Sequence, residues 1–186
     1  MNANSGSTQG ARALDSFRPE LVVSSLAGAR RGSMRTLPAF ALAILALLLV
    51  AGAGTFFQPG AWYAALDKPS FNPPAAVFGP AWAVLYAFNA IALALVLKAP
   101  RSSARRSALI AMGVQLVLCA LWTPVFFGAQ SMLAGLVVIT LLLAAIVAAV
   151  AAVWRVHAGA GALLLPYLAW VGFATVLNLS IWMLNA

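Results

Sequence analysis

Aromatic and amide side chains repeat at helical spacing in three apolar segments of this sequence. In the first segment the repeat is Phe78, Trp82, Tyr86 and Asn89. In the second it is Gln115, Cys119, Trp122 and Phe126, and in the third it is Tyr167, Trp170, Ala174 and Asn178. Each set occupies one face of a helix. Ligand pockets combine aromatic side chains with a few polar groups, so the three stripes predict a pocket for a flat, apolar ligand.

A proline-rich segment leads directly into the first stripe. Residues 62–86 hold six aromatic side chains, and four prolines fix the backbone between them. The aromatic residues are Trp62, Tyr63, Phe71, Phe78, Trp82 and Tyr86, and the prolines are Pro69, Pro73, Pro74 and Pro80. We predict that this segment forms a rigid cap over the aromatic pocket.

Two other interpretations of these side chains stay open. An aromatic belt at the membrane surface accounts for Trp62, Trp154 and Trp182, which lie near the ends of apolar segments. The amides of Asn89, Gln115 and Asn178 fit hydrogen bonds between helices as well as they fit ligand contacts.

Conventional catalytic and metal-binding groups are scarce in this sequence. One cysteine, Cys119, and one histidine, His157, exclude a disulfide framework and a Cys/His metal cluster. Asp67 is the only carboxylate side chain after Glu20, and it fits a loop ion pair or a turn. We predict no catalytic acid–base pair and no metal site, with Cys119 a packing residue and His157 solvated.

The composition places the helices that carry the stripes in a membrane. Hydrophobic residues make up 64% of the 186 residues and charged residues 8%, against about 25% charged residues in soluble domains. Runs of about 20 apolar residues, long enough to cross a bilayer, predict five spans at about 37–56, 76–97, 108–127, 132–153 and 163–184. The expected fold class is an all-α integral membrane protein, a five-transmembrane-helix bundle over residues 37–186. We expect Asn72 with Pro73 and Pro74 to cap the second span, and residues 157–161 to separate the fourth from the fifth.

The basic residues orient this bundle. Five arginines precede the first span, four basic residues lie between the second and third, and Arg155 follows the fourth, whereas Lys68 alone lies on the other side. The positive-inside rule then predicts a cytoplasmic N-terminus and an outer C-terminus. The expected location is a bacterial cell membrane, or alternatively a mitochondrial or other organelle membrane. The basic residues form no continuous face, which argues against a nucleic-acid partner despite a pI near 11.2.

Residues 1–36 differ in composition from the rest of the chain. They are rich in Ser, Ala and Arg, and Asp15 and Glu20 are their only acidic residues. We expect a disordered basic tail that is dispensable or that precedes the natural start at Met34, and a transit peptide is the alternative.

Three blocks of residues resemble the translocator protein / tryptophan-rich sensory protein (TspO/MBR) family. The first block contains Trp62, Tyr63, Leu66, Lys68, Pro69, Phe71, Pro73, Pro74, Phe78, Gly79, Pro80, Trp82, Leu85 and Tyr86. The second contains Gln115, Leu116, Leu121, Trp122, Pro124, Phe126, Phe127 and Gly128, and the third contains Pro166, Tyr167, Leu168, Trp170, Phe173, Ala174, Leu177 and Asn178. In order and spacing the resemblance covers essentially everything but the tail.

This resemblance implies a five-helix bundle, usually a homodimer, that binds porphyrins such as protoporphyrin IX and haem as ligands and requires no cofactor. Related members also bind sterols and benzodiazepine- or isoquinoline-type drugs, in a pocket between helices that the first loop closes. Carried over residue by residue, the pocket candidates are Tyr63, Pro73, Phe78, Trp82, Tyr86, Trp122, Phe126, Trp170, Ala174 and Asn178. The chain departs from the common pattern at Ala76, Cys119 and Val138, where many members have Trp, Asn and an acidic residue. The C-terminal sterol-recognition pattern lacks its Tyr and its basic residue after Leu177, so no sterol site is predicted.

Two functions follow from the stripes and the resemblance together. The first is a membrane receptor, sensor or carrier that regulates tetrapyrrole or stress responses. Its porphyrin stacks on Trp82, Tyr86 and Trp170, and the propionates reach loop groups such as Lys68. The alternative is an enzyme that degrades porphyrin with light and oxygen through Trp82 and Trp170. The absence of conventional catalytic groups favours binding and regulation.

Overall fold

The computed structural model describes Ala41, Gly52, Phe57 and residues 59–186. The described residues form helices and connecting turns, with no strand among them. Four helical stretches are long and apolar enough to cross a membrane: Ala75–Lys98, Ser103–Gly128, Met132–Trp154 and Ala158–Asn185. They confirm the all-α class and agree with the second to fifth predicted spans to within five residues at each end. The tail of residues 1–36 and the first predicted span, 37–56, lie outside the described residues apart from Ala41 and Gly52.

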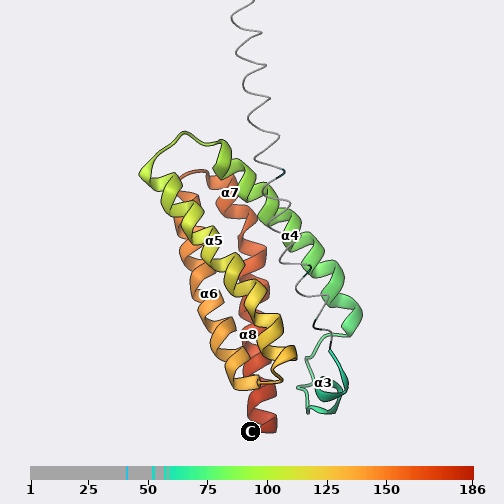
Figure 1. Cartoon of the computed structure of the whole chain (residues 1–186). Helices are drawn as coiled ribbons and strands as arrows, with labels where there is room; N and C mark the ends of the chain where they lie inside the picture. The colour runs from blue at the N-terminus through green and yellow to red at the C-terminus, as the bar shows by residue number, and fades with distance from the viewer. Residues whose placement is uncertain (1–40, 42–51, 53–56, 58) are drawn as a thin grey trace, which may run out of the picture. The chain divides into compact units, whose positions relative to one another are not determined.

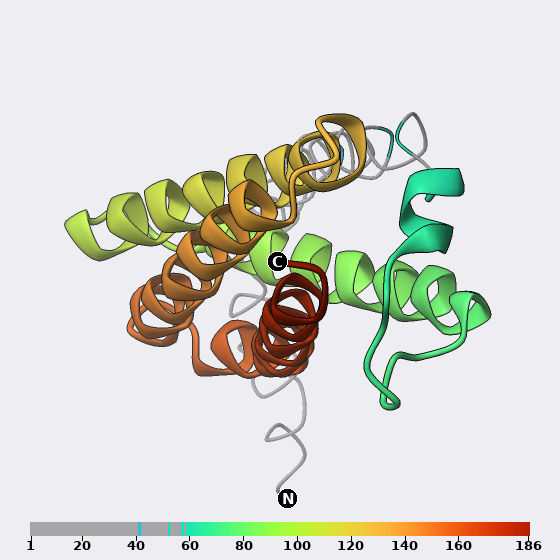
Figure 2. The ribbon, with the colours of Figure 1, turned by 90° about the horizontal axis from the view of Figure 1, so that it is seen from below.

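The described helices follow one another along the chain with short connections. The short α3 (Ala61–Ala65) is followed by α4 (Ala75–Lys98), α5 (Ser103–Thr123), the π-helical turn η1 (Pro124–Gly128), α6 (Met132–Trp154), α7 (Ala158–Leu163) and α8 (Leu165–Asn185). Figure 1 shows α5, α6 and α8 running side by side, with α7 at the end where α4 finishes. Seen from below in Figure 2, α4 diverges from α6 toward its N-terminal end, on the side where α3 lies.

Side-chain caps explain where several helices begin. The Ser102 Oγ accepts a 3.1 Å hydrogen bond from the Arg105 backbone N–H at the start of α5. The Ser131 Oγ accepts a 3.3 Å bond from the Ala134 N–H at the start of α6. Each bond satisfies one of the backbone donors that a helix leaves unpaired in its first turn.

The start of α4 differs from the sequence prediction. Its N-cap is Pro74, and no side chain caps its first turn. Asn72 was expected to cap this helix, but its Oδ1 lies 3.4 Å from the Tyr63 hydroxyl, which donates to it, and its Nδ2 donates to the Pro73 carbonyl. Proline needs no partner for a backbone N–H, and its fixed φ suits the entry to a helix.

The segment between the fourth and fifth spans also corrects a prediction. Residues 157–161 were expected to separate two spans, but Ala158–Leu163 form the helix α7, which leads through Leu164 directly into α8. His157 is exposed, as expected for a solvated side chain. Its ring also has a structural role, because its Nδ1 accepts a 3.1 Å hydrogen bond from the Ala160 N–H and caps α7. Gly161 is required for close approach, since a Cβ there would lie 2.6 Å from the Trp154 ring.

Two buried clusters divide the interior between the two ends of the bundle. Near the end of α4 the core is built mainly of small side chains, which let helices approach closely; its members are Ala92, Val96, Ala108, Met112, Ala149, Val153, Ala160 and Leu164. Toward α3 the core consists of Leu85, Cys119, Ile139, Leu142, Ile146, Tyr167 and Val171, with Trp82, Tyr86, Trp122 and Trp170 packed against it. The larger aromatic rings give a physical reason for the divergence of α4 toward this end.

Candidate ligand site

The three predicted stripes face the interior of the bundle. Among their twelve residues none is exposed, and Asn89, Gln115, Cys119, Phe126, Tyr167 and Asn178 are fully buried. Residues on the opposite faces are open to the surroundings; Val84, Val117 and Val176 are 52%, 67% and 54% exposed. The helical spacing therefore predicted correctly which face of each helix turns inward.

One group of rings joins α3 to η1, and we call it the loop cluster: Trp62, Tyr63, Trp122, Phe126 and Phe127. Trp122 stacks on Phe126, with ring centroids 5.1 Å apart and planes 16° apart. Trp62 meets the Phe126 ring edge-on at 5.6 Å, and Tyr63 meets Phe127 at 5.4 Å. Edge-on and offset-stacked pairs are the arrangements that aromatic rings prefer.

A second group of rings joins α4 to α8, and we call it the α4–α8 cluster: Phe71, Phe78, Trp82, Tyr86, Tyr167, Trp170 and Phe173. Phe78 and Trp170 meet edge-on with centroids 5.9 Å apart. Trp82 lies 5.3 Å from Tyr86 on its own helix and 6.2 Å from Tyr167 on α8. Phe71, from the loop before α4, reaches Phe173 at 6.2 Å.

The structure thus places seven of the ten predicted pocket residues in two clusters that flank one core. Tyr63, Trp122 and Phe126 belong to the loop cluster, and Phe78, Trp82, Tyr86 and Trp170 belong to the α4–α8 cluster. Ala174, Trp122, Trp82, Tyr86 and Trp170 all pack against the core that contains Cys119 and Tyr167. Pro73 is half-buried in the loop before α4. The remaining residue, Asn178, joins the loop cluster through Trp122.

Asn178 connects three helical elements by hydrogen bonds. Its Oδ1 accepts a 3.3 Å bond from the Trp122 indole Nε1–H, and its Nδ2 donates a 3.2 Å bond to the Met132 carbonyl at the start of α6. The side chain is 2% exposed. The second amide pair crosses from α5 to α4, where the Gln115 Nε2 donates to the Asn89 Oδ1 at 3.2 Å. These bonds are the interhelical links that the sequence left open as one of two interpretations.

The π-helical turn η1 sets the positions of adjacent phenylalanine rings. Its Pro124 carbonyl accepts a 2.8 Å hydrogen bond from the Ala129 N–H, five residues further on. Such turns widen a helix locally and are frequent at functional sites. Phe126 and Phe127 both join the loop cluster as a result, with their rings 4.9 Å apart. Gly135 on α6 approaches so closely that a Cβ there would lie 2.6 Å from the Phe126 ring.

The loop between α3 and α4 is fastened to the far end of α8. The Asp67 N–H donates to the Asn185 Oδ1, and the Asn185 Nδ2 donates to the Asp67 carbonyl, both at 2.9 Å. The Lys68 ammonium donates to the carbonyls of Ala64 and Leu66 at 3.2 and 2.8 Å, and it lies 4.8 Å from the centre of the Tyr63 ring. Burial raises the pKa of Tyr63, so this hydroxyl stays neutral and remains a donor.

Several ring contacts were missing from the sequence prediction. Trp62 was placed in the predicted cap, with an interfacial belt as the other interpretation, and its contact with Phe126 in the loop cluster was not predicted. Phe127 falls off the helical stripe of α5, because a stripe assumes α-helical spacing and η1 departs from it. Phe71 and Phe173 also join the rings without having been predicted, although the aromatic density of residues 62–86 was a signal for Phe71.

The fold and the rings together define a class of protein: an integral membrane protein of apolar helices whose interior is lined with aromatic side chains. Residues 40–183 match the model of the TspO/MBR family. The chain is 36% identical to Protein CrtK of Rhodobacter capsulatus, over 81% of this chain and 94% of that protein. It is 41% identical to Tryptophan-rich protein TspO of Archaeoglobus fulgidus, over 77% of this chain and 94% of that protein. It is 40% identical to human Translocator protein, over 65% of this chain and 73% of that protein. The chain belongs to the TspO/MBR family of membrane proteins, which includes proteins named as sensory proteins and as translocators.

Proposed function

We propose that this protein is a membrane receptor, sensor or carrier that binds porphyrins, such as protoporphyrin IX or haem, among the aromatic side chains of α4, α5, η1 and α8. The observation that carries the proposal is the convergence of three inward-facing stripes on one buried core that aromatic rings flank. Their rings supply flat apolar surface to a planar ligand, and each stacked or edge-on pair contributes about 0.5–1.5 kcal/mol beyond the burial of its area. The family membership supports the same class of ligand.

The polar groups around this core support an apolar ligand rather than a densely polar one. Asn178 uses both its amide oxygen and its amide nitrogen in bonds to the protein. Asn89 likewise donates to the Leu85 carbonyl and accepts from Gln115. A ligand with peripheral carboxylates would place them near the loop, where Lys68 supplies the positive charge in this proposal.

A titration of the purified full-length protein with protoporphyrin IX tests the proposal. The absorbance and fluorescence of the porphyrin report its binding directly, so the Kd can also be measured for variants that lack a tryptophan. The double variant Trp82→Leu with Trp170→Leu removes a ring from each side of the α4–α8 cluster. Two ring contacts at about 0.5–1.5 kcal/mol each predict a rise in Kd of about fivefold or more.

Two further variants sharpen the titration. Substituting phenylalanine for both tryptophans keeps a ring at each position and should give an intermediate Kd. Trp154→Leu is the matched control, because Trp154 is 47% exposed at the other end of the bundle and should leave the Kd unchanged. Saturable binding of unchanged affinity in the Trp82/Trp170 leucine variant would overturn the proposed site.

Illumination of the complex in air tests the enzymatic alternative. The proposal predicts that the porphyrin spectrum stays the same in the light as in the dark, apart from bleaching that free porphyrin also shows. A new absorbing product that forms with the wild-type protein and not with the leucine double variant would favour porphyrin degradation instead.

A further inference from the structure

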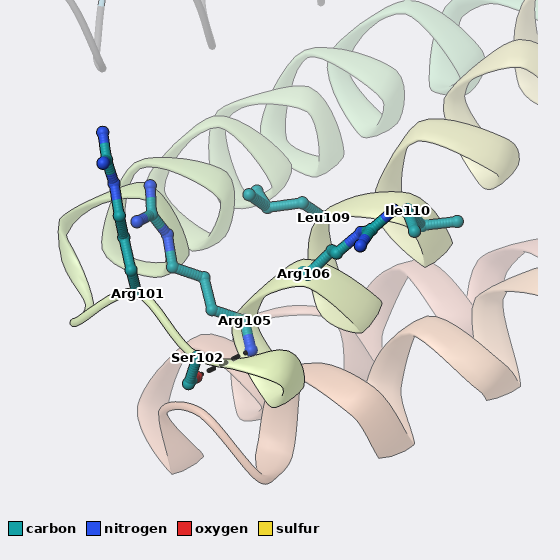
Figure 3. Close-up of a pocket in the computed structure, with 6 residues that line it drawn as sticks. All are labelled: Arg101, Ser102, Arg105, Arg106, Leu109 and Ile110. Atoms are coloured by element: carbon teal, nitrogen blue, oxygen red, sulfur yellow. Dashed lines mark hydrogen bonds between the residues drawn. The ribbon is translucent and has the colours of Figure 1, made fainter.

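A basic groove lies at the end of the bundle opposite the loop cluster. It has a volume of about 450 Å³ and is lined by Arg101, Ser102, Arg105, Arg106, Leu109 and Ile110. Figure 3 shows the side chains of Arg101 and Arg105 extending side by side in the same direction, with Arg106 lying along α5 toward Ile110. Three arginines therefore line the groove at the start of α5, where the helix dipole adds partial positive charge.

The described residues provide no negative charge to balance these arginines. Asp67 is the single described acidic side chain, and it lies in the loop fastened to Asn185 at the opposite end of the bundle. The Nε of Arg105 is enclosed by the protein and has no hydrogen-bond partner among the described residues. A buried donor on a charged group that lacks an acceptor is costly. The described part of the chain therefore places no anionic acceptor beside Arg105.

The geometry points to a phosphate group as this acceptor, and we propose that it belongs to the headgroup of an anionic phospholipid. A guanidinium group binds phosphate in a bidentate manner, through two parallel N–H···O hydrogen bonds. The Ser102 Oγ accepts from the Arg105 backbone N–H, so its own hydroxyl hydrogen remains available to a phosphate oxygen.

The apolar side of the groove favours a lipid over free phosphate. Leu109 is half-buried and Ile110 is 57% exposed, and both belong to the apolar stretch of α5 that is long enough to cross a membrane. An acyl chain can follow these side chains while the phosphate stays among the arginines at the membrane surface. Basic pockets at the ends of membrane helices are a known setting for anionic headgroups.

Binding of short-chain lipids to the delipidated full-length protein tests this site. Native mass spectrometry in a neutral detergent should show one saturable site for dioctanoyl phosphatidylglycerol and much weaker binding of dioctanoyl phosphatidylcholine. Removing one basic residue at a membrane surface weakens binding of anionic lipid about fivefold, so Arg105→Gln should raise the Kd by about that factor. Arg105→Gln with Arg101→Gln should raise the Kd about 25-fold by the same reasoning.

Two variants distinguish binding at this specific groove from general attraction of anionic lipid to surface charge. Arg155→Gln is the matched control: Arg155 is exposed and follows α6 at the same end of the bundle, outside the groove, so its loss should change the Kd less than twofold. Arg105→Lys keeps the positive charge but removes the Nε–H and the planar guanidinium group that binds phosphate in a bidentate manner, so it should still weaken binding. Circular dichroism of each variant checks that the helices are retained.

The remaining outcomes decide against the proposal. Equal weakening by Arg155→Gln and Arg105→Gln, or wild-type affinity in Arg105→Lys, would reduce the effect to unspecific surface charge. Inorganic phosphate binding as tightly as phosphatidylglycerol would overturn the assignment to a lipid and leave a site for free phosphate. The absence of any saturable site for either probe would overturn the proposal altogether.

Discussion

Gly135 on α6 lies against the loop cluster, and the Gly135→Ala substitution tests how firmly that cluster is packed. An added Cβ would lie 2.6 Å from the Phe126 Cδ2, 3.2 Å from the Phe126 Cβ and 3.3 Å from the Asn178 Oδ1. Favourable contacts between carbon atoms begin at about 3.5 Å. Either the Phe126 ring or α6 must therefore move by about 1 Å to admit one methyl group.

The Phe126 ring has little room for this movement. It is 2% exposed, stacks on Trp122 at 5.1 Å and touches Phe127 at 4.9 Å. Inserting a methyl group into such packing costs about 1–3 kcal/mol. Alanine is also the better helix former by about 1 kcal/mol, which offsets part of this cost in the measured free energy of unfolding.

Equilibrium unfolding in mixed micelles, followed by circular dichroism, measures this cost against a matched control. Gly113→Ala makes the same substitution within α5, where an added Cβ would meet nothing within 4 Å. Helix propensity contributes similarly to both variants, so Gly135→Ala should be less stable than Gly113→Ala by about 1–3 kcal/mol. It should also change the near-ultraviolet spectrum of the Trp122–Phe126 stack. Equal stability of the two variants would refute close packing of Phe126 against α6.

Three other contacts give testable outcomes. A double-mutant cycle with Asn89→Leu and Gln115→Leu should show a coupling free energy of about 0.6 kcal/mol in the same unfolding assay, whereas zero coupling would contradict the interhelical bond. Asn185→Ala should speed proteolytic cleavage of the loop that carries Asp67, with Asn185→Asp intermediate because it keeps only the acceptor; unchanged cleavage would show that the loop is held by other contacts. His157→Ala should lower the free energy of unfolding by about 0.5–2 kcal/mol through loss of the α7 cap, while His157→Asn should restore it.

Hydrophobic run length predicted the second to fifth spans, because a span must match the bilayer thickness. Helical spacing predicted the inward faces of three of them, because side chains on one face repeat with the α-helical period. The predictions that failed lie where a local bond or a tight approach decides the backbone. The stretch after His157 looked like a linker because it alternates Ala and Gly. It is helical because the imidazole caps it and Gly161 lets it lie against Trp154.

The candidate site was predictable in its residue types and only partly in its grouping. Helical spacing placed Trp82 and Trp170 on inward faces, but spacing within one helix cannot say which ring of another helix each will meet. The contact of Trp62 with Phe126 joins residues 64 positions apart, and it depends on the path of the loop and on the π-helical turn. The hydrogen bond between the Trp122 indole and the Asn178 amide likewise depends on how two helices pack, and the spacing within one helix does not predict it.

The buried polar atoms of the aromatic interior bear on how the proposed site selects its ligand. Strong rejection of an unsuitable ligand requires protein groups that are left unpaired when that ligand binds. Among the described residues, the Gln115 Oε1 and the Tyr167 hydroxyl are the buried polar side-chain atoms of this interior without a hydrogen-bond partner. One acceptor and one hydroxyl among so many rings select weakly by hydrogen bonding. Selection in the proposed site therefore rests on the shape and area of the ligand's ring system. Such a site accepts several flat ligands that differ in their peripheral groups, rather than one ligand with a particular set of polar groups.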